Sequence, residues 1–144
     1  MRNFLLSFFL LIMQACSNNA KTHIITQSAL LQQMQESSPP IIIDVRSEYE
    51  YQAGHIPAAL HIPFWNTFST DQLQSYSTTQ PFVLYCEHGP RAGIAKWGLS
   101  MQGFENIRYL QGHMSAWRKA GLPISPATDK QLVSRNVASY WRLC

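Results

Sequence analysis

The strongest constraint on the fold is an apolar run, residues 82–85, that stops abruptly at Cys86. A polar loop leads from Cys86 to Arg91, and the next segment, 92–101, has the apolar spacing of a packed helix face. The expected members of that face are Ile94, Ala95, Gly98 and Leu99. This order predicts a strand, a loop and a helix, with Cys86 at the carboxyl end of the strand.

A second apolar run, residues 41–45, is β-branched apart from Asp44. Such a run is typical of a strand that is buried on both faces of a parallel sheet. Short strands and helices alternate along the chain, which predicts an α/β fold of three layers, with a central, mainly parallel sheet and helices on both faces. Functional sites in such folds lie beyond the carboxyl ends of the strands, where Cys86 is expected.

Capping residues mark two further helices. Thr26 is a suitable N-cap for a helix that follows it. Ser47 can cap a short helix that Gly54 ends, with Glu48 and Glu50 near its positive end. The remaining expectations are an aromatic loop at 64–68, a short helix at 70–76, a strand within 103–110 and a final helix within 111–121.

The loop from Cys86 to Arg91 has the composition of an anion cradle. A loop that turns from a strand into a helix directs backbone N–H groups at its own centre, and the helix dipole adds positive charge there. This field favours the thiolate of Cys86, the nucleophilic form. Arg91 carries a planar, permanently charged group suited to oxyanions, while Gly89 and Pro90 shape the turn. The alternative is that Cys86 is a buried structural thiol, but a cysteine followed directly by a polar loop is not in a typical core environment.

The pattern Cys-x-x-Gly-x-Arg-Ala, formed here by Cys86, Gly89, Arg91 and Ala92, resembles the active-site loop of the rhodanese (sulfurtransferase) family. Other blocks resemble the same family in the same order along the chain. They are Asp-Val-Arg at 44–46, Gly-His-Ile-Pro at 54–57, Ile-Pro at 62–63, and a Trp-containing segment with Gly-x-Pro at 110–123. The resemblance covers about residues 24–124.

Three residues depart from the family pattern. Ala58 and His113 stand where glycines are usual, and His61 stands where asparagine is usual.

The resemblance implies a sulfurtransferase that needs no cofactor, with Cys86 as the catalytic nucleophile. Its thiolate would take a sulfane sulfur from a donor such as thiosulfate or a polysulfide, hold it as a persulfide, and pass it to a thiol or cyanide. The backbone amides of the loop would cradle that sulfur, and Arg91 would bind the donor or orient the loop. The implied substrate-binding residues are Glu87, His88, Gly89, Pro90 and Arg91.

Glu87 brings a negative charge to this loop. Because like charges repel, we expect thiosulfate to be a poorer donor than a neutral or protein-bound one. A phosphatase or arsenate reductase is a weaker alternative, because the related loops of those enzymes hold one residue more between cysteine and arginine. A module that binds persulfide or senses redox state without turnover, with Cys86 and Cys144 as its switch, is the other alternative.

Asp44, Arg46 and His55 are interpreted as structural. Charged groups at strand ends commonly tie the strand to its loops, so an ion pair between Asp44 and Arg46 is expected. His55 is expected to be a hydrogen-bonded structural histidine, and none of the three is assigned a catalytic role.

Composition and charge limit the classes of partner that we expect. The chain has 144 residues, of which 46% are hydrophobic, and a formal net charge of +3 without a basic stripe, so we expect no nucleic-acid partner. The cysteines and histidines show no metal-ligand spacing, so we expect no metal.

Both ends of the chain lie outside the family pattern. Residues 1–15 have the shape of a secretory signal peptide, and Cys16 follows in a sequence similar to a bacterial lipobox. We expect either lipidation of Cys16 or ordinary cleavage nearby, and an exported protein of the periplasm or cell envelope, lipid-anchored in the first case. Residues 16–23 would be a linker, and 125–144 a C-terminal extension whose apolar spacing indicates a helix.

Overall fold

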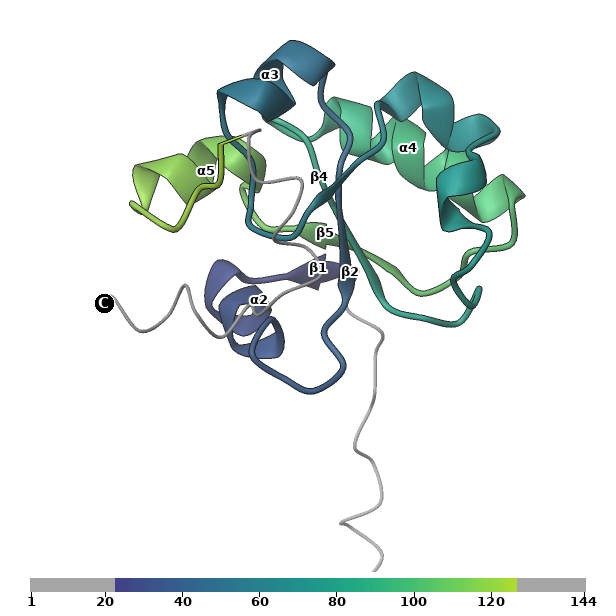
Figure 1. Ribbon diagram of the computed structural model, residues 1–144, viewed down its shortest axis with the longest axis horizontal. Coiled ribbons are helices and arrows are strands. Elements are labelled where there is room, and N and C mark those ends of the chain that lie inside the picture. The colour runs from purple at the N-terminus through teal and green to yellow at the C-terminus, as the bar shows by residue number, and fades with distance from the viewer. Residues whose placement is uncertain (1–22, 127–144) are drawn as a thin grey trace, which may run out of the picture.

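A five-stranded parallel sheet forms the centre of the fold (Figure 1). The computed structural model describes residues 23–126. Its strands are β1 (Ile24–Ile25), β2 (Ile41–Asp44), β3 (Leu60–His61), β4 (Phe82–Tyr85) and β5 (Ile107–Leu110). They lie in the order β1-β5-β4-β2-β3, and each neighbouring pair is parallel. The predicted parallel sheet is therefore confirmed, with β4, the strand before Cys86, at its middle.

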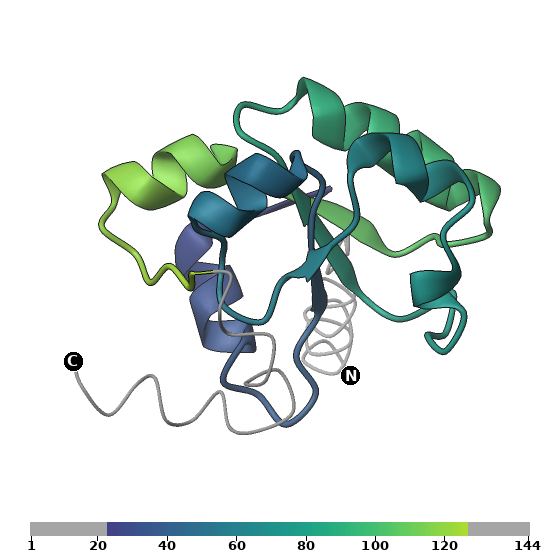
Figure 2. The ribbon, with the colours of Figure 1, turned by 45° about the horizontal axis from the view of Figure 1, so that its top comes forward.

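Helices cover both faces of this sheet, as predicted. The α-helices are α2 (Gln27–Gln33), α3 (Glu48–Ala53), α4 (Pro90–Met101) and α5 (His113–Lys119), and two 3₁₀ helices are η2 (Phe64–Phe68) and η3 (Asp71–Leu73). Figures 1 and 2 show α4 on one side of the sheet and α2 with α5 on the other. β4 is buried along its whole length because its alternate side chains enter the two cores.

The predicted caps are present. The Thr26 hydroxyl accepts the Ala29 N–H at the start of α2. At α3, Ser47 and Glu50 accept each other's backbone N–H groups in a capping box, and Gly54 ends the helix with a φ of 145°.

Three local predictions were wrong. Residues 64–68 form a 3₁₀ helix rather than a loop, and the helix expected at 70–76 is a single 3₁₀ turn behind the Thr70 cap. α4 begins at Pro90, before the predicted start, because proline has no N–H to satisfy and is favoured in a first helical turn.

Close packing of α4 against η2 explains which side of α4 is buried. Ala95, Gly98 and Leu99 are buried, whereas Ile94, which we predicted on the same face, is 43% exposed. A Cβ atom at Gly98 would lie 2.6 Å from the Thr67 hydroxyl oxygen and 3.0 Å from its backbone carbonyl. Because Gly98 has no side chain, η2 can approach the backbone of α4 closely at this position.

The predicted terminal features lie almost entirely outside the described residues. These are the signal segment 1–15, Cys16, the linker up to residue 22, and the extension from residue 127 with Cys144. Ser125, which we assigned to the extension, exchanges two backbone hydrogen bonds with His55, at 3.0 and 2.9 Å. Within residues 23–126, no helix has the length and apolarity needed to cross a membrane.

We predict that Gly98→Ala destabilises the domain, because the new methyl group meets Thr67 at less than van der Waals distance. The free energy of unfolding should fall by about 1 to 2 kcal/mol in urea denaturation. Gly93→Ala is the matched control, since a Cβ there has nothing within 4 Å and the same helix gains an alanine. It should raise stability by up to about 1 kcal/mol, and an equal effect of both changes would contradict the packing described.

Candidate active site

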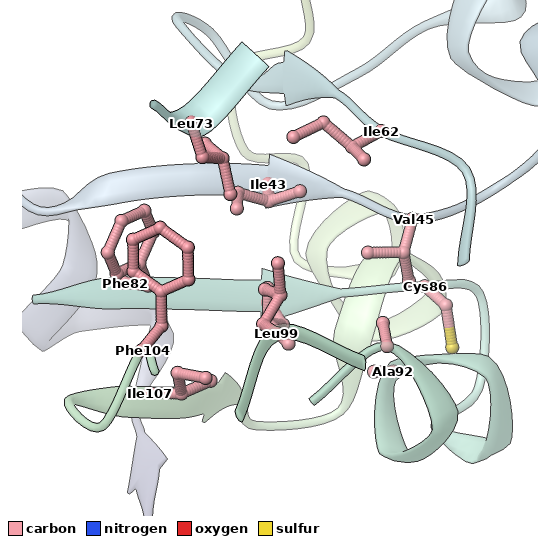
Figure 3. Close-up of a cluster of buried hydrophobic side chains, with 12 residues drawn as sticks. Ile43, Val45, Ile62, Leu73, Phe82, Cys86, Ala92, Leu99, Phe104 and Ile107 are labelled. Carbon is pink, nitrogen blue, oxygen red and sulfur yellow. The ribbon is translucent and has the colours of Figure 1, made fainter. Parts of the chain in front are cut away.

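Cys86 lies directly after β4 and begins the turn into α4. Its thiol is free, and the backbone N–H of Gly89 donates to Sγ over 3.0 Å. Gly89 has a φ of 126°, a conformation that side-chain-bearing residues rarely adopt, so glycine is needed for this N–H to face the sulfur. Figure 3 shows the sulfur at the border of the core, beside Ala92 in the first turn of α4.

Cys86 was interpreted either as a reactive thiol or as a buried structural thiol, and these two interpretations are not exclusive. The residue is 1% exposed and belongs to the core cluster on the α4 side of the sheet, so the polar loop did not prevent burial. The loop itself is accessible, since His88 and Pro90 are exposed. The sulfur is therefore shielded from bulk water, but it lies beside loop residues that are exposed at the surface.

The start of α5 fastens this loop from the other side. The Met114 N–H donates to the Cys86 carbonyl at 3.0 Å, and the Ser115 N–H donates to the Glu87 carbonyl at 3.3 Å. The Cys86 N–H in turn donates to Nδ1 of His113 at 3.3 Å. Three consecutive residues of α5 thus hold two consecutive residues of the loop.

The carboxylate of Glu87 is balanced by two arginines. Its Oε2 lies 3.4 Å from Nη1 of Arg46, and its Oε1 pairs with Nη2 of Arg118. The expectation that Glu87 repels dianionic donors stays a prediction, but this pairing weakens its physical basis because the negative charge is shared with two cations.

Arg91 points to α3, where it forms a two-pronged ion pair with Glu50. Its Nη1 lies 2.6 Å from Oε2 and its Nη2 lies 2.8 Å from Oε1. Hydrogen bonds from Arg91, assisted by Ser47, hold the pKa of Glu50 well below its usual range despite partial burial. Glu50 in turn raises the pKa of Arg91. This geometry favours orientation of the loop over the alternative role we considered for Arg91, direct binding of the donor.

A buried charged network lies beneath the loop. The predicted ion pair is confirmed: Arg46 Nε and Nη2 lie 3.0 and 2.7 Å from the two carboxylate oxygens of Asp44. The Tyr85 hydroxyl also donates to Asp44 at 2.8 Å, and Arg46 donates to the Gly54 carbonyl at 2.7 Å. Asp44, Arg46 and Tyr85 are almost completely buried, so this network ties β2, β4 and the end of α3 together.

The remaining histidines that we singled out have structural contacts. His55 is buried, its Nδ1 lies 3.0 Å from the Tyr51 carbonyl oxygen, and its ring stacks on that of Tyr51. His61, which replaces the usual asparagine, bonds the Arg46 carbonyl through Nε2 and pairs with Glu48 through Nδ1. Among residues 23–126, no cluster of three or more His, Cys, Asp or Glu residues could hold a metal ion.

Comparison with known proteins agrees with this geometry. Residues 26–120 match the Rhodanese-like domain family. The chain belongs to this family. The fold is also that of solved rhodanese-like structures: the rhodanese-like domain protein from Staphylococcus aureus superposes with a TM-score of 0.58 at 31% identity, covering 71% of this chain and 97% of that one.

Two curated relatives show the range of proteins that contain this domain. Thiosulfate sulfurtransferase GlpE from Vibrio cholerae is 30% identical over 65% of this chain and 86% of its own length. A tRNA uridine(34) hydroxylase from Buchnera aphidicola is 31% identical over 88% of this chain and 44% of its own length. The chain spans only 44% to 59% of the first curated relatives that it matches. Family membership therefore supports a sulfurtransferase-type protein without fixing the reaction.

We predict that the contribution of the Glu50–Arg91 pair to stability depends on pH. Because the folded-state pKa of Glu50 is lowered, its contribution is complete above the ordinary value of 4.5 and is lost as the pH falls below it. Glu50→Gln should therefore lower the free energy of unfolding by about 1 kcal/mol at pH 7, with the difference from wild type shrinking toward acid pH. Denaturant unfolding at several pH values measures this, with Glu36→Gln as control; a difference that grows below pH 4.5 would contradict the pairing.

Proposed function

We propose that the protein is a sulfurtransferase that carries a sulfane sulfur as a persulfide on Cys86. The observation that carries the proposal is the Gly89 N–H aimed at Cys86 Sγ over 3.0 Å, at the start of a helix. A donor in this position stabilises negative charge on sulfur, and the same charge must be borne by the thiolate and then by the terminal sulfur of a persulfide. Family membership supports the same chemistry.

The reaction divides into two displacements at sulfur. The Cys86 thiolate attacks the outer sulfur of a donor such as thiosulfate, an S–S bond forms, the donor's S–S bond breaks, and sulfite leaves with the electron pair. A thiophilic acceptor, cyanide or a thiolate, then attacks the terminal sulfur and regenerates the Cys86 thiolate. Each step exchanges one bond for another, so no separate oxidant, metal or cofactor is needed.

Thiosulfate belongs among the donors to be tested first, together with a polysulfide. The carboxylate of Glu87 is paired with Arg46 and Arg118, so it adds little net negative charge to the loop. A relative whose length this chain mostly covers is a thiosulfate sulfurtransferase, which supports the same choice.

We predict that Cys86→Ser abolishes sulfur loading. Wild-type protein treated with thiosulfate or a polysulfide should gain the mass of one sulfur atom by intact mass spectrometry and lose it to cyanide as thiocyanate. The serine variant should gain none, because its hydroxyl cannot form a persulfide. Equal loading of both proteins would refute the assignment, whereas wild-type protein that loads once but never releases sulfur to cyanide or a thiol would indicate a binding or sensing module.

We also predict that Glu50 and Arg91 act as a pair in sulfur loading. If Arg91 orients the loop through Glu50, then Glu50→Gln and Arg91→Ala should slow loading from thiosulfate by similar factors, about threefold to tenfold each. Glu36→Gln, a change at an exposed residue between α2 and β2, should have no effect. If Arg91→Ala alone slows loading while Glu50→Gln accelerates it, the guanidinium binds the donor instead.

A further inference from the structure

His113, at the start of α5, contacts the sulfur-bearing loop from outside it. Its Nδ1 accepts the backbone N–H of Cys86 at 3.3 Å. Its ring also lies against Gly89, where a Cβ atom would be 3.2 Å from Nε2. Cys86 and Gly89 are the two residues joined by the Sγ hydrogen bond, so one imidazole contacts both of these residues.

The backbone at His113 is costly for a residue with a side chain. His113 has a φ of 53°, directly after Gly112 at 69°, so two consecutive residues adopt the left-handed conformation. Glycine would adopt it without steric cost. At this costly position the imidazole contacts the loop, through Nδ1 at the Cys86 N–H and through Nε2 beside Gly89.

We propose that His113 is a positioning residue for sulfur transfer, which holds the Cys86–Gly89 turn in its sulfur-binding shape through its neutral imidazole. This inference rests on the proposed function and adds a residue to its machinery. As an acceptor at Nδ1, the neutral ring carries its proton on Nε2. Protonation would place a second donor opposite the Cys86 N–H and remove this hydrogen bond.

The surroundings keep the imidazole neutral. Burial, and secondarily the neighbouring His88, lower the pKa of His113 below its ordinary 6.5. Glu87 and Arg91 are engaged elsewhere, Glu87 with Arg46 and Arg118 and Arg91 with Glu50.

The nearby groups that titrate or carry charge are few enough to separate by mutation. Besides the paired Glu87 and Arg118, they are Cys86 and His88 in the loop, Lys96 on α4, and Tyr109 on β5, which lines a cavity together with His113. Because sulfur transfer also depends on the Cys86 thiolate, an acid loss of activity alone would not identify His113. The test therefore needs a readout at the Cys86 backbone.

Two substitutions separate the hydrogen bond from the backbone conformation. His113→Gly relaxes the left-handed backbone but removes the acceptor. His113→Asn keeps a side-chain oxygen near the place of Nδ1, tolerates the left-handed conformation, and does not titrate. At pH 7.5 we expect His113→Gly to load sulfur about tenfold more slowly than wild type, and His113→Asn to remain within about threefold of it.

The direct readout is the amide signal of Cys86 in full-length protein labelled with ¹⁵N-cysteine, assigned by its loss in Cys86→Ser. In wild type this signal should shift as the pH falls from 8 to 5, with a midpoint below 6.5. The shift should disappear in His113→Asn. It should persist in His88→Asn with a higher midpoint, because a neighbouring positive charge has been removed.

The outcomes distinguish this inference from the proposed function. A Cys86 amide that does not respond to pH in wild type, a response that survives in His113→Asn, or His113→Gly loading at the wild-type rate would overturn the positioning role. If wild type takes up no sulfur from any donor, the proposed function fails, while the amide titration still decides whether His113 controls the turn.

Discussion

The architecture of the site depends on the buried ion pair between Asp44 and Arg46. Two almost fully buried charges are tolerable only if their hydrogen-bonding groups are satisfied, and here the Tyr85 hydroxyl and the Gly54 carbonyl complete the set. Each partner comes from a different element at the carboxyl edge of the sheet. The pair therefore fixes the end of α3 relative to β4, and its remaining guanidinium nitrogen reaches Glu87 in the loop above.

The fold was largely predictable because the central strands have nearly continuous apolar sequences, as buried strands do. Residues 41–45 and 82–85 are apolar almost without interruption, as is typical of strands covered on both faces, and they supply two adjacent strands, β2 and β4, of the parallel sheet. The predictions failed where local signals compete with tertiary packing. Residues 64–68 wind into a 3₁₀ helix because η2 packs on α4 at Gly98, a contact that no local pattern reveals.

The sequence motif pointed to candidate site residues but could not reveal their partners. The loop motif identified Cys86 and Arg91, yet the pairing of Arg91 with Glu50 and the two arginines around Glu87 join residues far apart in the sequence. His113 was visible as a departure from a glycine, but its contact with the Cys86 N–H depends on how α5 docks on the loop. Ion pairs and hydrogen bonds between distant residues thus bear on roles that the motif left open.

The most direct test of the account is a high-resolution structure of the protein after treatment with thiosulfate. If Cys86 carries the sulfane sulfur, one additional sulfur should be bonded to Cys86 Sγ, lying inside the turn within hydrogen-bonding distance of loop amides, with the Arg91–Glu50 pair intact. An unmodified Cys86 beside a loaded thiol elsewhere, or a sulfur that points out of the turn away from the Gly89 N–H, would contradict it.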